Sequence, residues 1–257
     1  GDDTLDRDAR IKLTIGTKQQ SNADGLFYYP LGLAFDHHRG LLLVADSWNN
    51  RVQVFSCDDN DDGGSLVSKF GEYGDQPGQF VSPYGLAIDH DHDRIHIVEC
   101  GISRVQSWSL SEKSFLSCIG QYGSGDLEFQ YPQGIAIDKH HHRIILADTN
   151  NHRLVFLSSI DLSFLFKIGK QGSQPGEFRS PSGIAIDDDR HRIIVSDSGN
   201  HRVQVLSSID GSFLFEFGYR GPDRDQLEFP QGLCVANQGR IIVADLHNHR
   251  LQSFTHE

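Results

Sequence analysis

The feature that most constrains this chain is an internal repeat with a period of about 49 residues. The tripeptide Pro-x-Gly recurs five times, with steps of 53, 49, 49 and 49 residues between successive prolines. Each glycine is followed thirteen or fourteen residues later by an acid, and each acid is followed five residues later by an arginine. The five pairs are Asp46/Arg51, Glu99/Arg104, Asp148/Arg153, Asp197/Arg202 and Asp245/Arg250. A period of this length indicates an array built from one supersecondary unit.

Each repeat contains four short runs that are typical of β-strands. The third repeat reads Gly134–Ile137, Arg143–Ala147, Arg153–Leu157 and Leu165–Gly169 in this order. The runs are rich in β-branched, leucine and aromatic residues and are bounded by Gly, Pro, Asn and Asp. The inner runs lack polar alternation, as expected for a sheet covered on both faces. The sequence therefore predicts an all-β fold, a β-propeller with one four-stranded blade per repeat.

We count five blades, with six as the main alternative. The blades lie near residues 30–71, 83–120, 132–169, 181–218 and 230–254, within a propeller of residues 11–257 that follows an N-terminal tail of residues 1–10. The fifth repeat lacks its fourth run, and residues 11–16 match the pattern of that run. We therefore expect the N-terminal strand to close the ring and remove two exposed sheet edges.

One recurrent motif connects the chain to a known family. The motif Asn151-His152-Arg153-Leu154 recurs at residues 200–203 and 248–251, whereas the first two repeats read Asn49-Asn50-Arg51-Val52 and Ile102-Ser103-Arg104-Val105. At these residues the chain resembles the NHL-repeat family, over essentially residues 11–257. The resemblance implies a propeller, more often with six blades. Such a propeller is commonly the C-terminal domain of tripartite-motif ubiquitin ligases and of Brat-type translational repressors.

Charge and cysteine content narrow the function classes. The formal net charge of −12 disfavours non-specific attraction to nucleic acid, so we expect no DNA partner. No stretch approaches the roughly 18 apolar residues of a spanning helix, so we expect no membrane partner. The cysteines Cys57, Cys100, Cys118 and Cys234 have no regular spacing. They indicate reduced thiols in a cytoplasmic protein rather than a metal pattern or a disulfide framework.

The binding residues are expected where the repeats differ, because five-fold recurrence of the acid–arginine pairs suits a scaffold. All seven tyrosines fall in the segments that join the fourth strand of one blade to the first strand of the next. In a propeller these segments share a face with the turns between strands two and three. Aromatic side chains with a polar group favour recognition surfaces. The predicted binding residues are Trp48, Tyr73, Tyr84, Tyr122, Tyr131, Lys170, Arg179, Tyr219, Arg220 and Arg224.

The opposite face carries histidine-rich and acidic turns, at residues 90–93, 140–142 and 187–189. Such residues can ligate transition metals. Each turn belongs to a different blade, however, and no spacing brings them together, so we expect solvated turns with no metal site and no cofactor. Residues 58–63 match the first positions of a calcium loop, but Lys69 stands where the bidentate glutamate belongs.

Three functions follow from these observations. The first is a non-catalytic binding module that presents its aromatic face to a protein or peptide, as the recognition domain of a larger protein. The second is single-stranded RNA binding on the same face, as the resemblance to Brat-type repressors implies. The third is a metalloenzyme, because amidating lyases of peptide hormones also resemble this propeller. The residues between Pro and Gly include no usual metal ligand, so we expect no catalytic site; they are Leu31, Tyr84, Gln133, Ser182 and Gln231.

Overall fold

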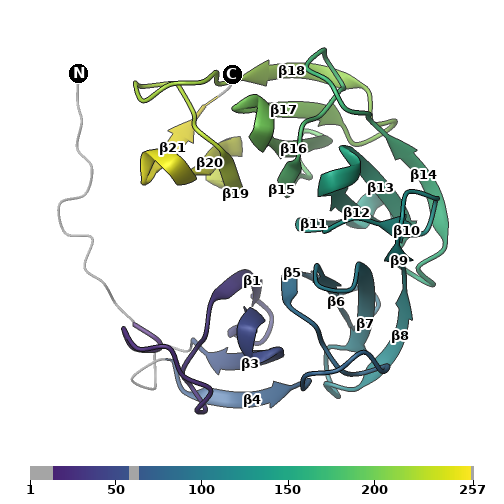
Figure 1. Ribbon diagram of the computed structural model, residues 1–257, viewed down its shortest axis with the longest axis vertical. Coiled ribbons are helices and arrows are strands. Elements are labelled where there is room, and N and C mark those ends of the chain that lie inside the picture. Colours follow the sequence, from purple (N-terminus) through teal and green to yellow (C-terminus); the bar gives the residue numbers. More distant parts are fainter. Residues whose placement is uncertain (1–13, 58–63, 256–257) are drawn as a thin grey trace.

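The computed structural model describes residues 14–57 and 64–255, and these residues form a five-bladed all-β propeller (Figure 1). Each of the first four blades is a four-stranded antiparallel sheet in sequential order, and the fifth has three strands. Blade one contains β1 (Pro30–Asp36), β2 (Leu41–Asp46), β3 (Arg51–Ser56) and β4 (Leu66–Phe70), and blade two contains β5 (Pro83–Asp89), β6 (Arg94–Glu99), β7 (Arg104–Ser109) and β8 (Phe115–Ile119). Blade three contains β11 (Ile135–Asp138), β12 (Arg143–Asp148), β13 (Arg153–Ser158) and β14 (Phe164–Ile168). Blade four contains β15 (Pro181–Asp187), β16 (Arg192–Asp197), β17 (Arg202–Ser207) and β18 (Phe213–Phe217), and blade five contains β19 (Pro230–Ala236), β20 (Arg240–Asp245) and β21 (Arg250–Phe254).

The loops between these strands contain short strands and 3-10 turns. The parallel strands β9 (Gln121–Tyr122) and β10 (Glu128–Phe129) lie between blades two and three. Residues 14–57 and 64–255 contain six 3-10 turns of three residues, namely η1 (Ser47–Asn49), η2 (Lys139–His141), η3 (Thr149–Asn151), η4 (Ser198–Asn200), η5 (Asn237–Gly239) and η6 (Leu246–Asn248). In the part of the chain that the structure describes, no helix has the length and apolarity needed to cross a membrane.

The hydrophobic core is divided among the seams between blades. Four apolar clusters fill the four seams that join blades one to five in sequence. Phe80, Phe129 and Phe178 lie three residues before the second, third and fourth repeated prolines, and they are fully buried members of these clusters. Gly71, the glycine after β4, has φ +86°, and a Cβ there would lie 2.2 Å from the Phe80 ring. A glycine therefore ends this outer strand because both its backbone and its neighbour exclude a side chain.

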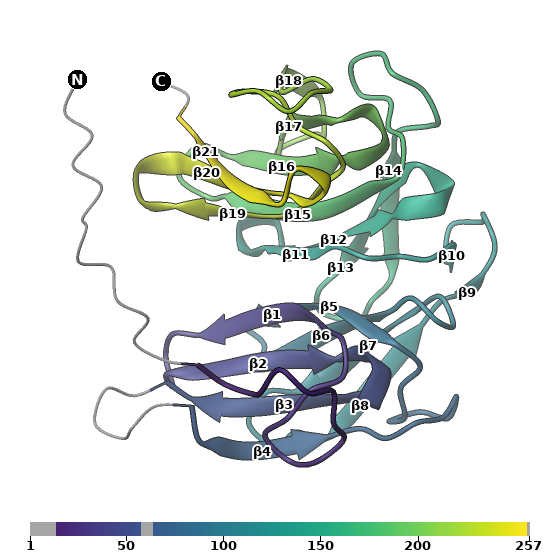
Figure 2. The ribbon, with the colours of Figure 1, turned by 60° about the vertical axis from the view of Figure 1, so that its left-hand side comes forward.

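Within the described residues, the ring is open between blades five and one (Figures 1 and 2). On the side of blade one that faces the opening, Leu33 is 63% exposed, whereas Leu86 at the same position of blade two is 7% exposed. On blade five, Leu251 is 72% exposed, whereas its counterpart Leu154 in blade three is fully buried. These side chains would be buried if a further sheet packed against them. The described residues therefore form an arc of five blades with four seams.

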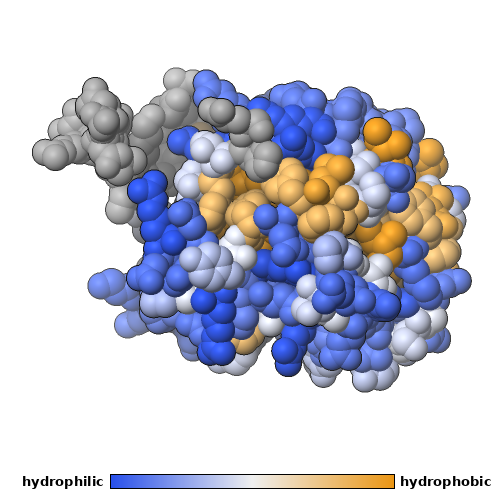
Figure 3. Space-filling view, turned by 90° about the horizontal axis from the view of Figure 1, so that it is seen from above, coloured by the Kyte–Doolittle hydropathy of each residue, from blue (hydrophilic) through white to orange (hydrophobic). Residues whose placement is uncertain are grey.

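The predicted closing strand lies mainly outside the described residues. Of residues 11–16, only Thr14, Ile15 and Gly16 are described, and they belong to no strand. The sheet of blade five ends at β21. Figure 3 shows apolar side chains gathered on the side of the molecule where β18 lies. The five-blade count is confirmed, and closure by the N-terminal strand stays a prediction.

Candidate functional site

The repeated acid is the centre of a buried hydrogen-bond network, shown here for blade three. Asp148 is fully buried, and its Oδ1 accepts the backbone N–H of Gln130 at 2.7 Å. Its Oδ2 accepts from Asn151 Nδ2 at 2.8 Å and from Arg153 Nε at 2.7 Å. Burial raises the pKa of the Asp148 carboxyl, although these donors act in the opposite direction. The corresponding acid–arginine ion pair occurs in all five blades, as predicted.

The arginine of each pair holds the loop that leads into its blade. Arg153 donates from its two terminal nitrogens to the carbonyl oxygens of Ser124, Gly125 and Glu128. These carbonyls belong to the segment between blades two and three. Because the network binds only backbone atoms of that segment, the loop is fixed while its side chains stay free to vary. The acid–arginine pair is therefore part of the scaffold beneath the predicted binding face.

The histidine of the recurrent motif links blades three and four to the blades that follow them. His152 Nδ1 accepts the backbone N–H of Ser180 at 3.0 Å, and His201 Nδ1 accepts that of Phe229 at 3.3 Å. Burial lowers the pKa of both histidines, which favours the neutral imidazole that can accept. In blade one Asn50 Oδ1 fills the same role. The motif therefore supplies an asparagine to its own loop, a histidine to the next blade and an aliphatic residue to the core.

The residue before each repeated proline has a left-handed backbone. Its φ lies between 47° and 59° in Tyr29, Ser82, Tyr131, Ser180 and Phe229. This conformation is uncommon for residues with a side chain and more so before proline. The scaffold imposes it in every blade, while the side chain changes from one blade to the next. At Tyr29 and Tyr131 the position presents a half-exposed tyrosine to solvent.

We call the face formed by these loops and by the turns between strands two and three the tyrosine face. Over blade one it carries an aromatic group of Tyr28, Tyr29 and Trp48. The Trp48 ring stacks on Tyr29 with centroids 5.1 Å apart and meets Tyr28 edge-on at 4.9 Å. Tyr84 belongs to the neighbouring blade and is half-buried, and burial raises the pKa of its hydroxyl. The predicted residue Trp48 is therefore the centre of this group, whereas Tyr28 and Tyr29, which contact it, were not among the predicted binding residues.

Farther out on the same face, one loop position is repeated with different side chains. Tyr73, Tyr122, Gln171 and Arg220 each form a short parallel bridge to the buried residue seven positions later. Tyr73 is 74% exposed and Tyr122 is 67% exposed. A fixed backbone thus displays two tyrosines in blades two and three and an amide and a guanidinium in the following segments. The structure places both predicted tyrosines where a partner can reach them.

The predicted basic residues are partly neutralised by local carboxylates. Lys170 pairs with Glu177, and Arg220 pairs with Glu228, each at 3.2 Å. Arg179 and Arg224 are exposed and make no ion pair with any described residue, and Tyr219 is exposed beside Arg220. The ten predicted residues share one face but are spread along the arc rather than gathered in a single pocket.

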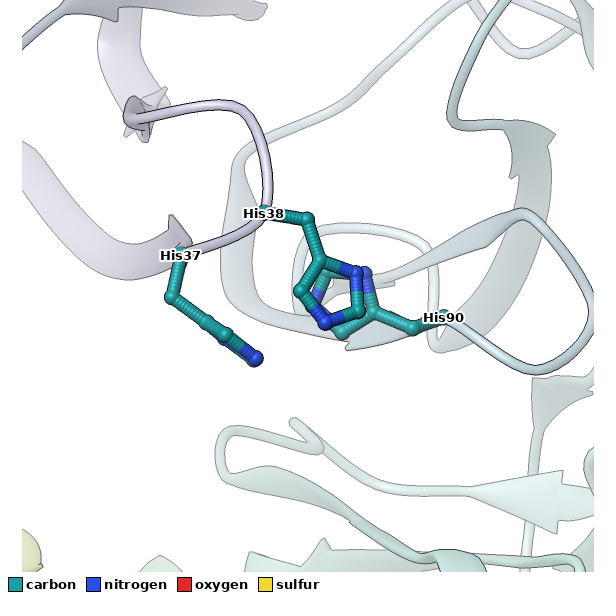
Figure 4. A group of neighbouring side chains, drawn as sticks. All are labelled: His37, His38 and His90. Atoms are coloured by element: carbon teal, nitrogen blue, oxygen red, sulfur yellow. The ribbon is translucent and has the colours of Figure 1, made fainter.

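On the opposite face, which we call the histidine face, one prediction is wrong. We expected the turns of different blades to stay apart, but His37, His38 and His90 come together from the turns of blades one and two (Figure 4). The physical reason is that packed blades place equivalent turns side by side, and His37 and His90 occupy the same repeat position. The predicted acidic loop at residues 58–63 lies outside the described residues.

Comparisons with known proteins agree with the repeat. Residues 27–55, 129–155, 178–206 and 227–254 match the family described as NHL repeat. The second blade, which has glutamate as its acid and lacks the asparagine–histidine pair, is not among the matched segments. No curated protein sequence matches the chain significantly.

Solved structures show the same fold at low sequence identity. A nidogen/laminin complex gives a TM-score of 0.62 at 16% identity, covering 88% of this chain and 79% of that chain. Virginiamycin B lyase from Staphylococcus aureus gives 0.61 at 13%, covering 88% and 69%. An auxiliary nutrient binding protein from Bacteroides ovatus gives 0.65 at 12%, covering 87% and 58%. At these identities the likeness establishes the propeller architecture.

Proposed function

We propose that this chain, which belongs to the NHL-repeat family of β-propellers, is a non-catalytic module that binds a protein or peptide through its tyrosine face. The observation that carries the proposal is a set of exposed aromatic side chains on loops whose backbone is bound by the buried acid–arginine network. These side chains are Tyr29, Trp48, Tyr73, Tyr122 and Tyr131. Tyrosine and tryptophan supply large contact areas at a low entropic cost, and they dominate the energetics of many interfaces.

Charge favours a protein or peptide over RNA. Phosphate contacts need unpaired basic side chains, but Lys170 and Arg220 are already paired with glutamates. Near Tyr73 the loop carries the exposed acids Glu72 and Asp75. A partner segment that combines apolar or aromatic residues with basic residues would suit this side of the face.

The known relatives support a binding role without defining the partner. The nidogen/laminin structure is a complex of two proteins, and the Bacteroides ovatus propeller is described as a nutrient binding protein. The virginiamycin B lyase shows that a similar propeller can also support catalysis. All four cysteines are free, which supports a cytoplasmic location. The proposal of a recognition domain within a larger protein, such as a ubiquitin ligase, rests on the family to which the repeats belong.

Single-stranded RNA is the second candidate, because exposed tyrosines can stack bases and Arg179 and Arg224 are unpaired among the described residues. The two candidates differ in their dependence on salt. Affinity for RNA should fall steeply between about 50 and 200 mM salt, whereas affinity for an apolar peptide should change little.

The test is selection of ligands from a displayed peptide library and from a single-stranded RNA pool, with the wild-type chain as bait. Each selected ligand is then titrated against Trp48→Ala, Tyr122→Ala and the control His141→Ala, which lies on the histidine face. Peptides whose affinity falls only in the two aromatic variants would support the proposal. Selection of RNA alone, or of ligands insensitive to both aromatic changes, would reject it.

A further inference from the structure

The histidine face contains a group of three imidazoles, and this group is separate from the binding surface proposed on the tyrosine face. β1 ends at Asp36 and is followed by His37 and His38, while β5 ends at Asp89 and is followed by His90. The ring centroids are 4.3 Å apart for His37 and His38, 4.8 Å for His37 and His90, and 4.2 Å for His38 and His90. Figure 4 shows side chains from two neighbouring turns reaching into the same space.

We propose that His37, His38 and His90 form a binding site for one divalent transition-metal ion, with Zn²⁺ as the best-suited ion, which ties the first two blades together. One potential ligand atom from each residue lies within 4.8 Å of the other two. In a tetrahedral zinc site the bonds to nitrogen are about 2.0–2.1 Å, which places ligand nitrogens about 3.3 Å apart. Rotation of the exposed His37 and His38 side chains toward the half-buried His90 supplies the remaining approach.

The ligand chemistry selects the class of ion. Neutral imidazole suits zinc, copper and nickel, whereas calcium and magnesium require oxygen ligands. The fourth position is open to water, as in zinc sites with three protein ligands.

A buried carboxylate supports the site from behind. Asp36 is fully buried, and its Oδ1 lies 3.9 Å from His90 Nδ1. The same oxygen accepts the backbone N–H groups of His38 and Arg39, which fixes the turn that carries two of the ligands. Carboxylates in this outer position orient ligand histidines and strengthen metal binding.

Two cations near the site oppose metal binding. The Arg39 guanidinium pairs with Asp36 at 2.9 Å and with Asp93 at 3.4 Å, and the Lys113 ammonium interacts with the same groups. These ion pairs offset much of the positive charge. The other seams of this face bring together histidines in pairs only, with centroids 5.5 Å apart for His92 and His142 and 5.6 Å for His140 and His191. Only the first seam therefore offers three imidazoles in the part of the chain that the structure describes.

The experiment is a titration of untagged, metal-free protein with Zn²⁺ by calorimetry, and with Co²⁺, whose visible absorption reports tetrahedral coordination. We expect one equivalent to bind and Zn²⁺ to raise the melting temperature by linkage. His90→Ala and His37→Ala should each weaken binding by more than about 10-fold and abolish the thermal shift. His142→Ala, from the neighbouring seam, should bind like the wild type.

Fold integrity is checked by the melting temperature without metal, and the exposed His37 provides the informative variant if His90→Ala does not fold. Affinity should also fall as the pH is lowered from 7 to 5.5, because protons compete for the imidazoles. The absence of a Zn²⁺-induced thermal shift in the wild type would overturn the proposal. Undiminished binding by folded His37→Ala together with reduced binding by His142→Ala would move the site to another seam and also overturn it.

Discussion

A buried histidine should make the stability of this propeller fall at acidic pH, and one substitution should remove that part of the pH dependence. His96 lies at the centre of β6 and is fully buried, where blades three and four carry Ile145 and Ile194. Its Nδ1 is 2.7 Å from Ser107 Oγ, whereas its Nε2 has no partner among the described residues. Burial lowers the pKa of His96 from 6.5 to about 4. The folded protein therefore keeps a neutral ring at pH values where the unfolded chain takes up a proton.

The sign and size of the effect follow from proton linkage. Because the folded pKa is depressed, the stability associated with His96 is complete above pH 6.5 and is lost as the pH falls toward 4. The full difference between the two pKa values corresponds to about 3 kcal/mol, and about 2 kcal/mol of it is lost by pH 5. His96→Ile removes the titrating group, so the variant should lose about 2 kcal/mol less than the wild type between pH 8 and pH 5.

The assay is urea unfolding of both proteins at pH 8, 6.5 and 5, with the pH dependence of the unfolding free energy as the measured quantity. His96→Ile leaves the buried Ser107 hydroxyl without its partner, which costs about 1 kcal/mol at every pH. The double variant His96→Ile/Ser107→Val restores an apolar cross-strand pair like Ile194 and Val205. If all three proteins lose the same stability between pH 8 and pH 5, the buried-histidine explanation is wrong.

Three further predictions test the scaffold and the face. Asp148→Ala should lower the free energy of unfolding by about 1–3 kcal/mol, because it leaves a buried arginine and a backbone N–H without their acceptor. Ligand affinity should stay unchanged, and a variant as stable as the wild type would contradict the proposed role of the network. Tyr122→Ala should weaken partner binding by about 1–3 kcal/mol in calorimetric titration, with less than about 0.5 kcal/mol lost from the fold. Gly71→Ala should lower the urea midpoint more than Gly176→Ala does. Both glycines have positive φ, but only at Gly71 would a Cβ lie against the Phe80 ring. Equal decreases of the midpoint would show that backbone strain alone matters.

The fold was largely predictable because each repeat contains the same sequence motifs. The Pro-x-Gly tripeptide, the acid and the arginine mark the same strand ends in every blade, so the chain could be divided into blades before any contact was known. The acid–arginine pairing followed from chemistry, since a recurrent buried carboxylate needs a recurrent donor. Phe80, Phe129 and Phe178 share one repeat position, three residues before the proline, and all three are fully buried.

The remaining features depend on relations between blades that no single repeat contains. The meeting of His37 and His90 becomes predictable only when equivalent turns of adjacent blades are placed side by side. The role of Tyr29 depends on a left-handed backbone shared by all five pre-proline residues and on stacking with Trp48.

The arc formed by the described residues has two end blades, and local unfolding is expected to begin in end blades. In an array whose stability is a sum of blade and neighbour terms, blades one and five have one neighbour each, while blade three has two and lies farthest from either end. Amide protons in β19–β21 should therefore exchange with solvent through low-energy openings, and those in β12 and β13 only near global unfolding. If the N-terminal strand closes the ring, as the sequence predicts, all five blades should instead be protected alike. The arc should thus unfold from its end blades inward and refold most readily from its middle.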